Sequence, residues 1–390
     1  NSFCTLLGTP GTEMPPKRQG GGSAARAAAN LAPRVPFVEA NESLRATEEE
    51  RSATSKSLYG DHKARVSANT HHIHDRLRLR AYTAAVHAGM RGKRVLHLGC
   101  GMGLVSMLAA KAPAAHVVAV DTSTIVNAAR VVAADNKIAN VTFLQGSLHE
   151  GTVQLPEAHR EFDVILCEWM SSFVTNDSAS LRELLFCRDN FLAAGGTVCP
   201  NKAELSVVGI ADYQYKCDTV DYWDSVYGFN MAPMKDLVMR EPTGCPIPKH
   251  LIKSKPCTTI SLDVFDLKQP KDLDVKDKTK NAHLVVEGDF EINVTSKSTL
   301  HFLTFYVSGQ NRQQDCPAAN FDLASAPGAA NPWSEVSAAL PEALPVFAGD
   351  VVSGHVRIEP KGNDTEITLS VKLSNDLIQH ESTTVHHFQY

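Results

Sequence analysis

Three glycines and one acid give the chain its clearest chemical signal. Gly99, Gly101 and Gly103 follow a short apolar run, and Asp121 lies about 20 residues further on. Glycine can adopt a positive φ and has no Cβ, so such a loop lets the backbone pass close to a ligand. An acid at that spacing can accept hydrogen bonds from a ribose diol. The pattern therefore favours a nucleoside-binding site over a βαβ turn in which glycine serves only tight packing.

The form of the loop narrows the ligand class. A dinucleotide loop reads GxGxxG, whereas this loop reads GxGxG and has Leu104 where the third glycine would fall. That difference favours S-adenosylmethionine over NAD. A second acid, Glu168, directly follows the apolar stretch 162–167, and the carboxyl ends of parallel strands are where such sheets bind ligands. We therefore expect Glu168 to lie near the glycine loop.

The elements that must position these residues follow from apolar periodicity. Apolar runs at 95–98 and 117–120 predict strands, and the spacing of Leu104, Met107 and Leu108 predicts a helix between them. Further alternation of helix and strand continues to about residue 196. The first part of the chain is therefore predicted to be half of a doubly wound α/β sheet, preceded by a helical cap.

Beyond residue 200 the pattern changes to a period of two. Apolar residues alternate with polar ones at 290–294 and 367–373, which predicts an antiparallel β domain. The stretch 212–238 interrupts this domain and is rich in aromatic residues and Met. Such enrichment marks an interface more often than a cofactor site, and packing in the chain's own core is the alternative.

Composition sets the limits for the whole chain. The 390 residues are 43% hydrophobic and 21% charged, which is enough for two domains, and the net charge of −5 gives no general nucleic-acid signature. The nine cysteines form no CxxC pair, and no apolar stretch reaches the roughly 18 residues of a membrane span. We therefore expect a reduced, soluble, cytoplasmic protein.

The first 45 residues are rich in Gly, Ala, Pro and Arg, and we expect them to be disordered. Met14 is consistent with a natural start, which makes residues 1–13 a remnant of cloning; a mitochondrial presequence is the weaker alternative. His71, His72 and His74 have no Cys or acidic partner at ligand spacing, so we expect no metal.

These features together resemble the protein arginine N-methyltransferase family over about residues 59–375. The glycine loop, the sequence Glu168-Trp169-Met170 and the aromatic insertion carry the resemblance. It implies a Rossmann-like S-adenosylmethionine domain over 46–200 and a β-barrel domain over 201–390. It also implies that 212–238 is a helical dimerisation arm that docks on the cofactor domain of a partner subunit.

The resemblance also implies roles for single residues. Arg78 would hold the methionine carboxylate of the cofactor, Gly99 and Gly101 would line it, and Asp121 would hold its ribose. Glu168 would be the first of two carboxylates that bind the substrate guanidinium. The second is Asp177, and the interface residues are Tyr222, Trp223, Tyr227, Phe229 and Met231.

Several positions depart from the family pattern. His97 stands where the family has an acid before the loop, Met102 where it has Thr, and His149 where it has an adenine-contacting Glu. These changes exchange hydrogen-bond acceptors and a small hydroxyl for imidazoles and a bulky thioether. A site that is built around hydrogen bonds loses affinity steeply when its partners are exchanged.

The predicted substrate site departs as well. Asp177 is a shorter acid than the family's Glu, Pro332 replaces a histidine, and Lys63 replaces a tyrosine. A misplacement of about 1 Å in a reacting group can cost about a hundredfold in rate. The sequence thus favours a site that no longer supports efficient catalysis.

The interpretation is a non-catalytic regulatory subunit, or prozyme, of a heteromeric type I arginine methyltransferase, similar to the prozyme class of kinetoplastids. It would activate a catalytic paralogue that holds S-adenosylmethionine and methylates arginine-containing, for instance RNA-binding, proteins; its own cofactor binding would be weak or absent. One alternative is an active, divergent arginine methyltransferase. The other is a methyltransferase-fold RNA-binding or scaffold protein.

Overall fold

The computed structural model describes residues 61–175, 178–244, 246–267, 285–323, 335–361 and 364–389, all of which belong to one compact unit. The N-terminal residues 1–45, for which we predicted disorder, lie outside these ranges. Asp177 and Pro332 also lie outside them.

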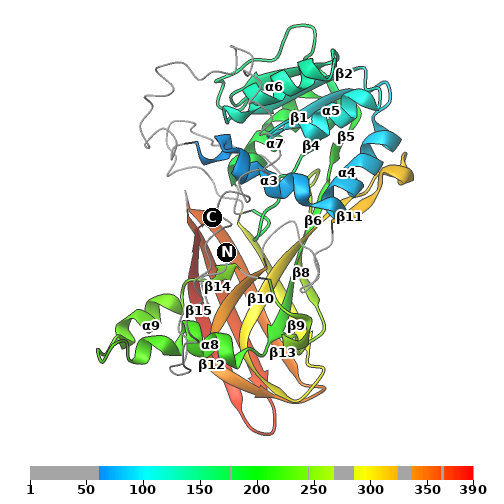
Figure 1. Ribbon diagram of the computed structural model, residues 1–390. Coiled ribbons are helices and arrows are strands. Elements are labelled where there is room, and N and C mark those ends of the chain that lie inside the picture. The colour runs from blue at the N-terminus through cyan, green and yellow to red at the C-terminus, as the bar shows by residue number, and fades with distance from the viewer. Residues whose placement is uncertain are drawn as a thin grey trace, which may run out of the picture. The chain divides into compact units, whose positions relative to one another are not determined.

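The first half of the described chain is built on a five-stranded parallel sheet of order β3-β2-β1-β4-β5 (Figure 1). The predicted α/β fold is therefore confirmed. The strand order reverses between β1 and β4, and in such sheets ligands bind outside the carboxyl ends of the strands at that reversal. The strands are β1 (Arg94–Leu98), β2 (His116–Asp121), β3 (Val141–Gln145), β4 (Phe162–Cys167) and β5 (Leu192–Cys199).

Helices connect these strands and precede them. Asp75 separates the first two helices and caps the second, because its side chain accepts a hydrogen bond of 2.9 Å from the backbone N–H of Arg78. That cap fixes the start of the helix that carries Arg78. The helices are α3 (Val66–His74), α4 (Arg76–Gly89), α5 (Leu104–Lys111), α6 (Ile125–Asp135) and α7 (Ser178–Phe191), with a short turn η2 (His62–Ala64) ahead of them.

The second half contains two antiparallel sheets, of order β7-β12-β10-β6-β8, with β11 also pairing with β10, and of order β15-β14-β13-β9. Every second side chain of β14 from Thr365 to Leu373 is buried, as the period of two predicts. The strands are β6 (Lys202–Ile210), β7 (Thr243–Gly244), β8 (Cys257–Asp263), β9 (Val286–Asn293), β10 (Ser298–Asn311), β11 (Phe321–Leu323), β12 (Val336–Val346), β13 (Val351–Lys361), β14 (Asp364–Ser374) and β15 (Gln379–Gln389).

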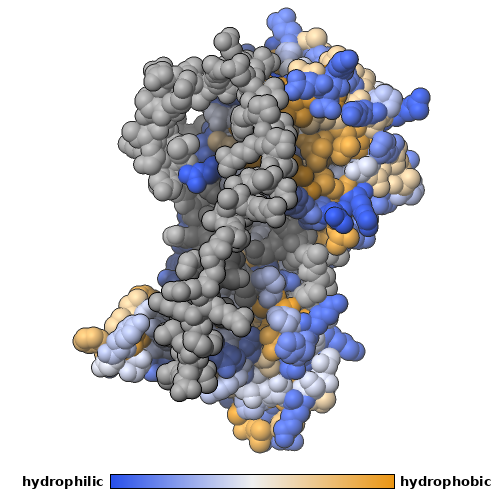
Figure 2. Space-filling model, viewed as in Figure 1, coloured by the Kyte–Doolittle hydropathy of each residue, from blue (hydrophilic) through white to orange (hydrophobic). Residues whose placement is uncertain are grey.

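A helical arm is inserted between β6 and β7. It consists of α8 (Tyr213–Thr219), η3 (Asp221–Asp224) and α9 (Ala232–Val238), and it extends sideways from the strands of this domain (Figure 1). Asp221 holds the arm together, since it pairs with Lys216 at 2.6 Å and with Lys235 at 2.9 Å. Figure 2 shows hydrophobic surface at the end of this protrusion.

Aromatic side chains join the parallel sheet to the β domain. Trp169 is fully buried after β4, and its Nε1–H donates to the carbonyl of Pro200 at 3.0 Å. The ring of Phe173 lies 5.8 Å from that of Phe305 and 5.2 Å from that of Phe388. The loop that follows Glu168 is therefore fixed by buried contacts with β10 and β15.

Among the helices of the described residues, none has both the length and the apolar character that a membrane crossing would require.

Candidate functional site

The carboxyl end of the parallel sheet opens into a cavity of about 430 Å³. Its size lies within the range of about 300–1,000 Å³ that is typical of cofactor pockets. The cavity is lined by all of the predicted cofactor residues and by one predicted catalytic residue: Arg78, Gly99, Gly101, Asp121 and Glu168. Residues that are up to about 90 positions apart in sequence thus meet at one site, as the sheet topology predicts.

The glycine loop follows β1 and leads into α5. Gly99, Gly101 and Gly103 have φ values of +65°, +52° and +77°, which L side chains rarely adopt. A Cβ on Gly103 would also lie only 2.7 Å from the ring of Phe143. The loop therefore needs glycine both for its backbone conformation and for its close packing.

Asp121 ends β2 and ties the glycine loop to it. One carboxylate oxygen accepts a hydrogen bond of 2.7 Å from the backbone N–H of Gly101, and the other accepts one of 2.8 Å from Ser123. Asp121 is only 8% exposed. Because an ionised carboxylate has about four acceptor positions, these two bonds leave it able to accept more.

Arg78 and Glu168 bind each other across the cavity. The Nε of Arg78 lies 3.0 Å and 2.8 Å from the two carboxylate oxygens of Glu168, and an Nη–H also donates to one of them. Burial acts to lower the pKa of Arg78, but the attraction and hydrogen bonds of Glu168 outweigh it and the pKa is raised. The guanidinium also lies 5.3 Å from the ring centre of Tyr82. The two charges that were predicted to bind different ligand groups therefore neutralise one another.

His97 lies in β1 directly before the loop and lines the same cavity. Its Nδ1 is 2.6 Å from the hydroxyl of Ser106. Burial and the nearby charge of Arg78 lower the pKa of His97 to about 3, so its imidazole is neutral at pH 7. Met102 contributes a thioether to the lining two residues before α5.

Glu183 is a site residue that the sequence did not single out. From α7 it accepts hydrogen bonds from the hydroxyl of Ser147 at 2.5 Å, from the N–H of Leu148 at 2.7 Å and from the N–H of His149 at 3.1 Å. It thereby fixes the turn that carries His149, whose ring meets Phe186 edge-on at 5.6 Å. An acid on a predicted helix has no distinctive spacing, so only the fold reveals this role.

Residues of η2 and α3 also line the cavity, and they include Lys63, His71 and His72. Burial is the main cause that lowers the pKa of His72 to about 4, and the charge of Arg78 adds to it. The rings of His71 and His72 are 3.8 Å apart. Within the ranges that the structure describes, no three His, Cys, Asp or Glu side chains gather as metal ligands.

The predicted interface residues lie on the arm, and its tip is strongly exposed. Tyr227 is 96% exposed and Phe229 is 71% exposed, whereas Tyr222 is 48% exposed. Trp223 and Met231 are partly buried. The alternative that these residues pack in the chain's own core is therefore wrong for Tyr227 and Phe229.

Family models match both the parallel-sheet part and the β domain of this chain. Residues 90–241 match the family described as a methyltransferase domain, and residues 201–377 match the arginine methyltransferase oligomerization subdomain. Protein arginine N-methyltransferase 1 of Schizosaccharomyces pombe is 29% identical, over 82% of this chain and 89% of its own length.

Two solved structures are also similar. A chain of the Trypanosoma brucei PRMT1 enzyme-prozyme heterotetrameric complex with AdoHcy is 41% identical with a TM-score of 0.76, over 83% of this chain and 99% of that chain. Arabidopsis thaliana protein arginine methyltransferase 10 is 19% identical with a TM-score of 0.68, over 83% of this chain and 98% of that chain, and supports the fold alone. Because the identity to the first extends over nearly all of that chain, this protein belongs to the protein arginine N-methyltransferase family.

Proposed function

We propose that this chain is the non-catalytic regulatory subunit, or prozyme, of a heteromeric type I arginine methyltransferase. The observation that carries the proposal is the lining of the cofactor cavity by His97, Met102 and His149. These side chains replace acceptors and a small hydroxyl of the family pattern with two imidazoles and a thioether. The apolar core and the arm are kept, so the departures from the family pattern affect cofactor binding and catalysis and not the fold.

The residues of the cavity fit S-adenosylmethionine poorly. Arg78, the expected partner of the methionine carboxylate, is bound to Glu168. A ligand carboxylate would have to displace a partly buried acid that makes a bidentate ion pair, which is among the stronger pairings in proteins. We therefore propose that cofactor binding here is weak or absent and that S-adenosylmethionine is held by the catalytic partner.

The arm supports an assembly role. Tyr227 adopts a φ of +50° at the exposed tip, and such a conformation in a non-glycine residue costs about 1–3 kcal/mol. Exposed aromatic side chains on a strained turn are suited to insertion into a partner. The similar Trypanosoma brucei structure is an enzyme-prozyme heterotetramer, and by analogy the partner is a catalytic paralogue. The complex would act on arginine-containing proteins in the cytoplasm.

One alternative has a specific observation in its favour. Arg78, Gly99, Gly101, Asp121 and Glu168 all line the cavity, as an active but divergent arginine methyltransferase would require. This chain would then methylate arginine without a partner. Activity of the isolated chain distinguishes the two functions.

The arm tip gives a direct test of assembly. We expect the double variant Tyr227→Ala, Phe229→Ala to keep its fold, because both side chains are exposed, and to lose the complex with the catalytic paralogue. Truncation of aromatic side chains at the centre of an interface commonly costs about 2 kcal/mol or more. The measurements are co-elution in size-exclusion chromatography and methylation by the partner.

The matched control is Leu377→Ala, which removes a side chain that is 61% exposed in the turn between β14 and β15 and should leave the complex intact. Co-elution of the double variant at wild-type stoichiometry would show that the arm is not the interface. Dissociation with full activity of the partner would show that this chain does not activate it.

A further inference from the structure

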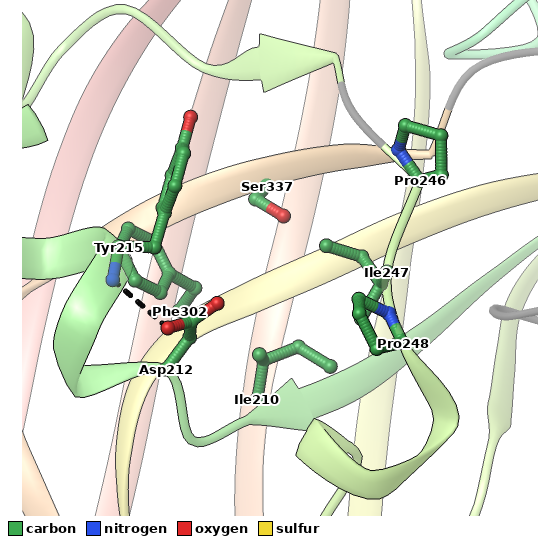
Figure 3. A pocket seen from close by; sticks show the side chains of 8 residues that line it. All are labelled: Ile210, Asp212, Tyr215, Pro246, Ile247, Pro248, Phe302 and Ser337. Atoms are coloured by element: carbon green, nitrogen blue, oxygen red, sulfur yellow. Dashed lines mark hydrogen bonds between the residues drawn. The ribbon is translucent and has the colours of Figure 1, made fainter. Parts of the chain in front are cut away.

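A second cavity lies in the β domain where the arm begins (Figure 3). Its volume is about 180 Å³, and its lining comes from the end of β6, the start of the arm, residues 246–248, β10 and β12. This volume is below the roughly 300 Å³ at which cofactor pockets begin. The cavity therefore suits a single side chain and not a cofactor.

The walls are aromatic and aliphatic. Tyr215 and Phe302 face the cavity, with ring centres 5.5 Å apart and planes inclined by 60° (Figure 3). Ile210 and Ile247 are buried beside them and belong to a small separate cluster of apolar side chains. Such walls can cover the apolar stem of a long side chain.

A carboxylate stands at the edge of this apolar space. One oxygen of Asp212 caps α8 by accepting a hydrogen bond of 2.9 Å from the N–H of Tyr215. In Figure 3 the other oxygen is turned away from that N–H and toward the cavity. Lys216, one turn along α8, pairs with Asp221 at 2.6 Å, and no ion pair of Asp212 occurs among the described residues.

A second acid, Glu335, lies next to Ile247 on the opposite wall. Glu335 is 2% exposed, and its carboxylate accepts a hydrogen bond of 3.1 Å from the N–H of Ile247. Glu335 makes a further interaction and does not line the cavity, so the cavity combines aromatic walls with one carboxylate, that of Asp212. A cation with an apolar stem complements both features, because ring faces attract cations and an acid can pair with them.

We propose that this cavity binds one arginine side chain from an extended segment of a partner protein. The methylene stem of the arginine would lie against Ile210 and Ile247, and its guanidinium would meet the aromatic faces and Asp212. Arginine fits better than lysine because a flat guanidinium stacks on aromatic rings and is less strongly hydrated than an ammonium. The site is separate from the cofactor cavity and does not depend on the regulatory role proposed above.

The test is saturation-transfer NMR on the full chain with five-residue glycine peptides that differ only at the central position. The central residue is arginine, lysine, or citrulline, which is close to arginine in shape but uncharged. We expect the arginine peptide to bind with a dissociation constant of about 1 mM. The citrulline peptide should bind at least about tenfold more weakly, as expected for the loss of one charge-assisted hydrogen bond.

Two substitutions with equal charge change locate the binding. Asp212→Asn should weaken the binding of the arginine peptide about tenfold. It should keep the helix cap, since Asn caps helices as well as Asp does. Asp218→Asn, in the same helix, is the control and should leave binding unchanged, because Asp218 accepts a hydrogen bond from Gln214 and does not line the cavity. Phe302→Leu should also weaken binding by removing an aromatic wall.

Equal binding of the arginine and citrulline peptides would overturn the proposal, because the charge would not be recognised. Unchanged binding in Asp212→Asn would overturn it as well, because the peptide would then be bound elsewhere on the chain. Tighter binding of the lysine peptide would contradict the assignment to arginine.

Discussion

Some single residues of the cofactor cavity are placed as the family pattern implies, and others are not. Asp121 still links the glycine loop to β2, and Glu168 still faces the cavity. Arg78, however, is engaged by Glu168, and His97 is neutral because burial and Arg78 lower its pKa to about 3. The site therefore offers a cofactor fewer free charged groups than its residue types suggest.

We expect the isolated chain to bind S-adenosylmethionine with a dissociation constant weaker than about 100 μM. The physical reason is that His97, Met102 and His149 replace hydrogen-bonding partners on the lining. Titration calorimetry measures this directly. The variant His97→Asp, Met102→Thr, His149→Glu, which restores the family pattern, should bind at least about tenfold more tightly. A low-micromolar constant for the unaltered chain would contradict the prediction.

The site residues that could be predicted from their spacing in the sequence are those that lie close together along the chain. The glycine triplet and Asp121 lie within one βαβ unit, so their meeting could be predicted. The bond between Arg78 and Glu168 joins residues 90 positions apart, and the bonds of Glu183 join α7 to a turn 34 to 36 positions earlier. Neither has a local pattern, because both depend on how the helices pack against the sheet.

At the scale of elements, the glycine loop depends on packing as much as on ligand approach. Gly103 directly precedes α5 and has a φ of +77°, and the space beside it is filled by Phe143 and Ala129. The sequence predicted the loop but not this crowding, because Phe143 lies on β3, two strands away. The third glycine therefore has a structural function that the loss of cofactor chemistry would not relax.

The substitution Gly103→Ala should lower the free energy of unfolding by about 2–6 kcal/mol, since backbone strain and overpacking each cost about 1–3 kcal/mol. Gly92→Ala is the matched control: Gly92 has a φ of +69°, but no atom lies within 4 Å of its added Cβ. It should cost only about 1 kcal/mol of strain. Urea unfolding of both variants measures the difference, and equal costs would show that packing at Gly103 is unimportant.

The arm shows where composition alone cannot decide. Aromatic and Met enrichment is expected of a core as well as of an interface, and both occur within the insertion. Trp223 is partly buried and contacts Tyr222, whereas Tyr227 and Phe229 at the tip are exposed. Asp221 pairs with lysines on α8 and α9, and these contacts between separate helices have no local pattern in the sequence.

At the scale of the whole molecule, buried histidines make stability depend on pH. His386 on β15 is 1% exposed, and burial lowers its pKa to about 4. The ordinary value is 6.5. Between these two values the unfolded chain binds more protons than the folded chain. The contribution of His386 to stability is therefore fully present above about pH 6.5 and is lost as the pH falls toward 4.

We expect His386 to contribute about 2 kcal/mol to the loss of stability between pH 7 and pH 5. In His386→Leu this part of the pH dependence should disappear, whatever the variant's stability at pH 7. Urea unfolding at the two pH values measures the difference for each protein. If the free energy of unfolding falls equally between pH 7 and pH 5 in the variant and in the unaltered chain, His386 is not the source of this pH dependence.

The regulatory role proposed for this chain requires two subunits with separate functions: this chain contributes assembly, and a catalytic paralogue contributes chemistry. The most direct measurement is the rate of methyl transfer to an arginine peptide by this chain alone, by the paralogue alone, and by their equimolar mixture. We expect no turnover by this chain alone and at least about a tenfold gain in the mixture over the paralogue alone, within the usual range of coupling between sites. Turnover by this chain alone at the rate of the mixture would rule out the regulatory role, as would a mixture no faster than the paralogue.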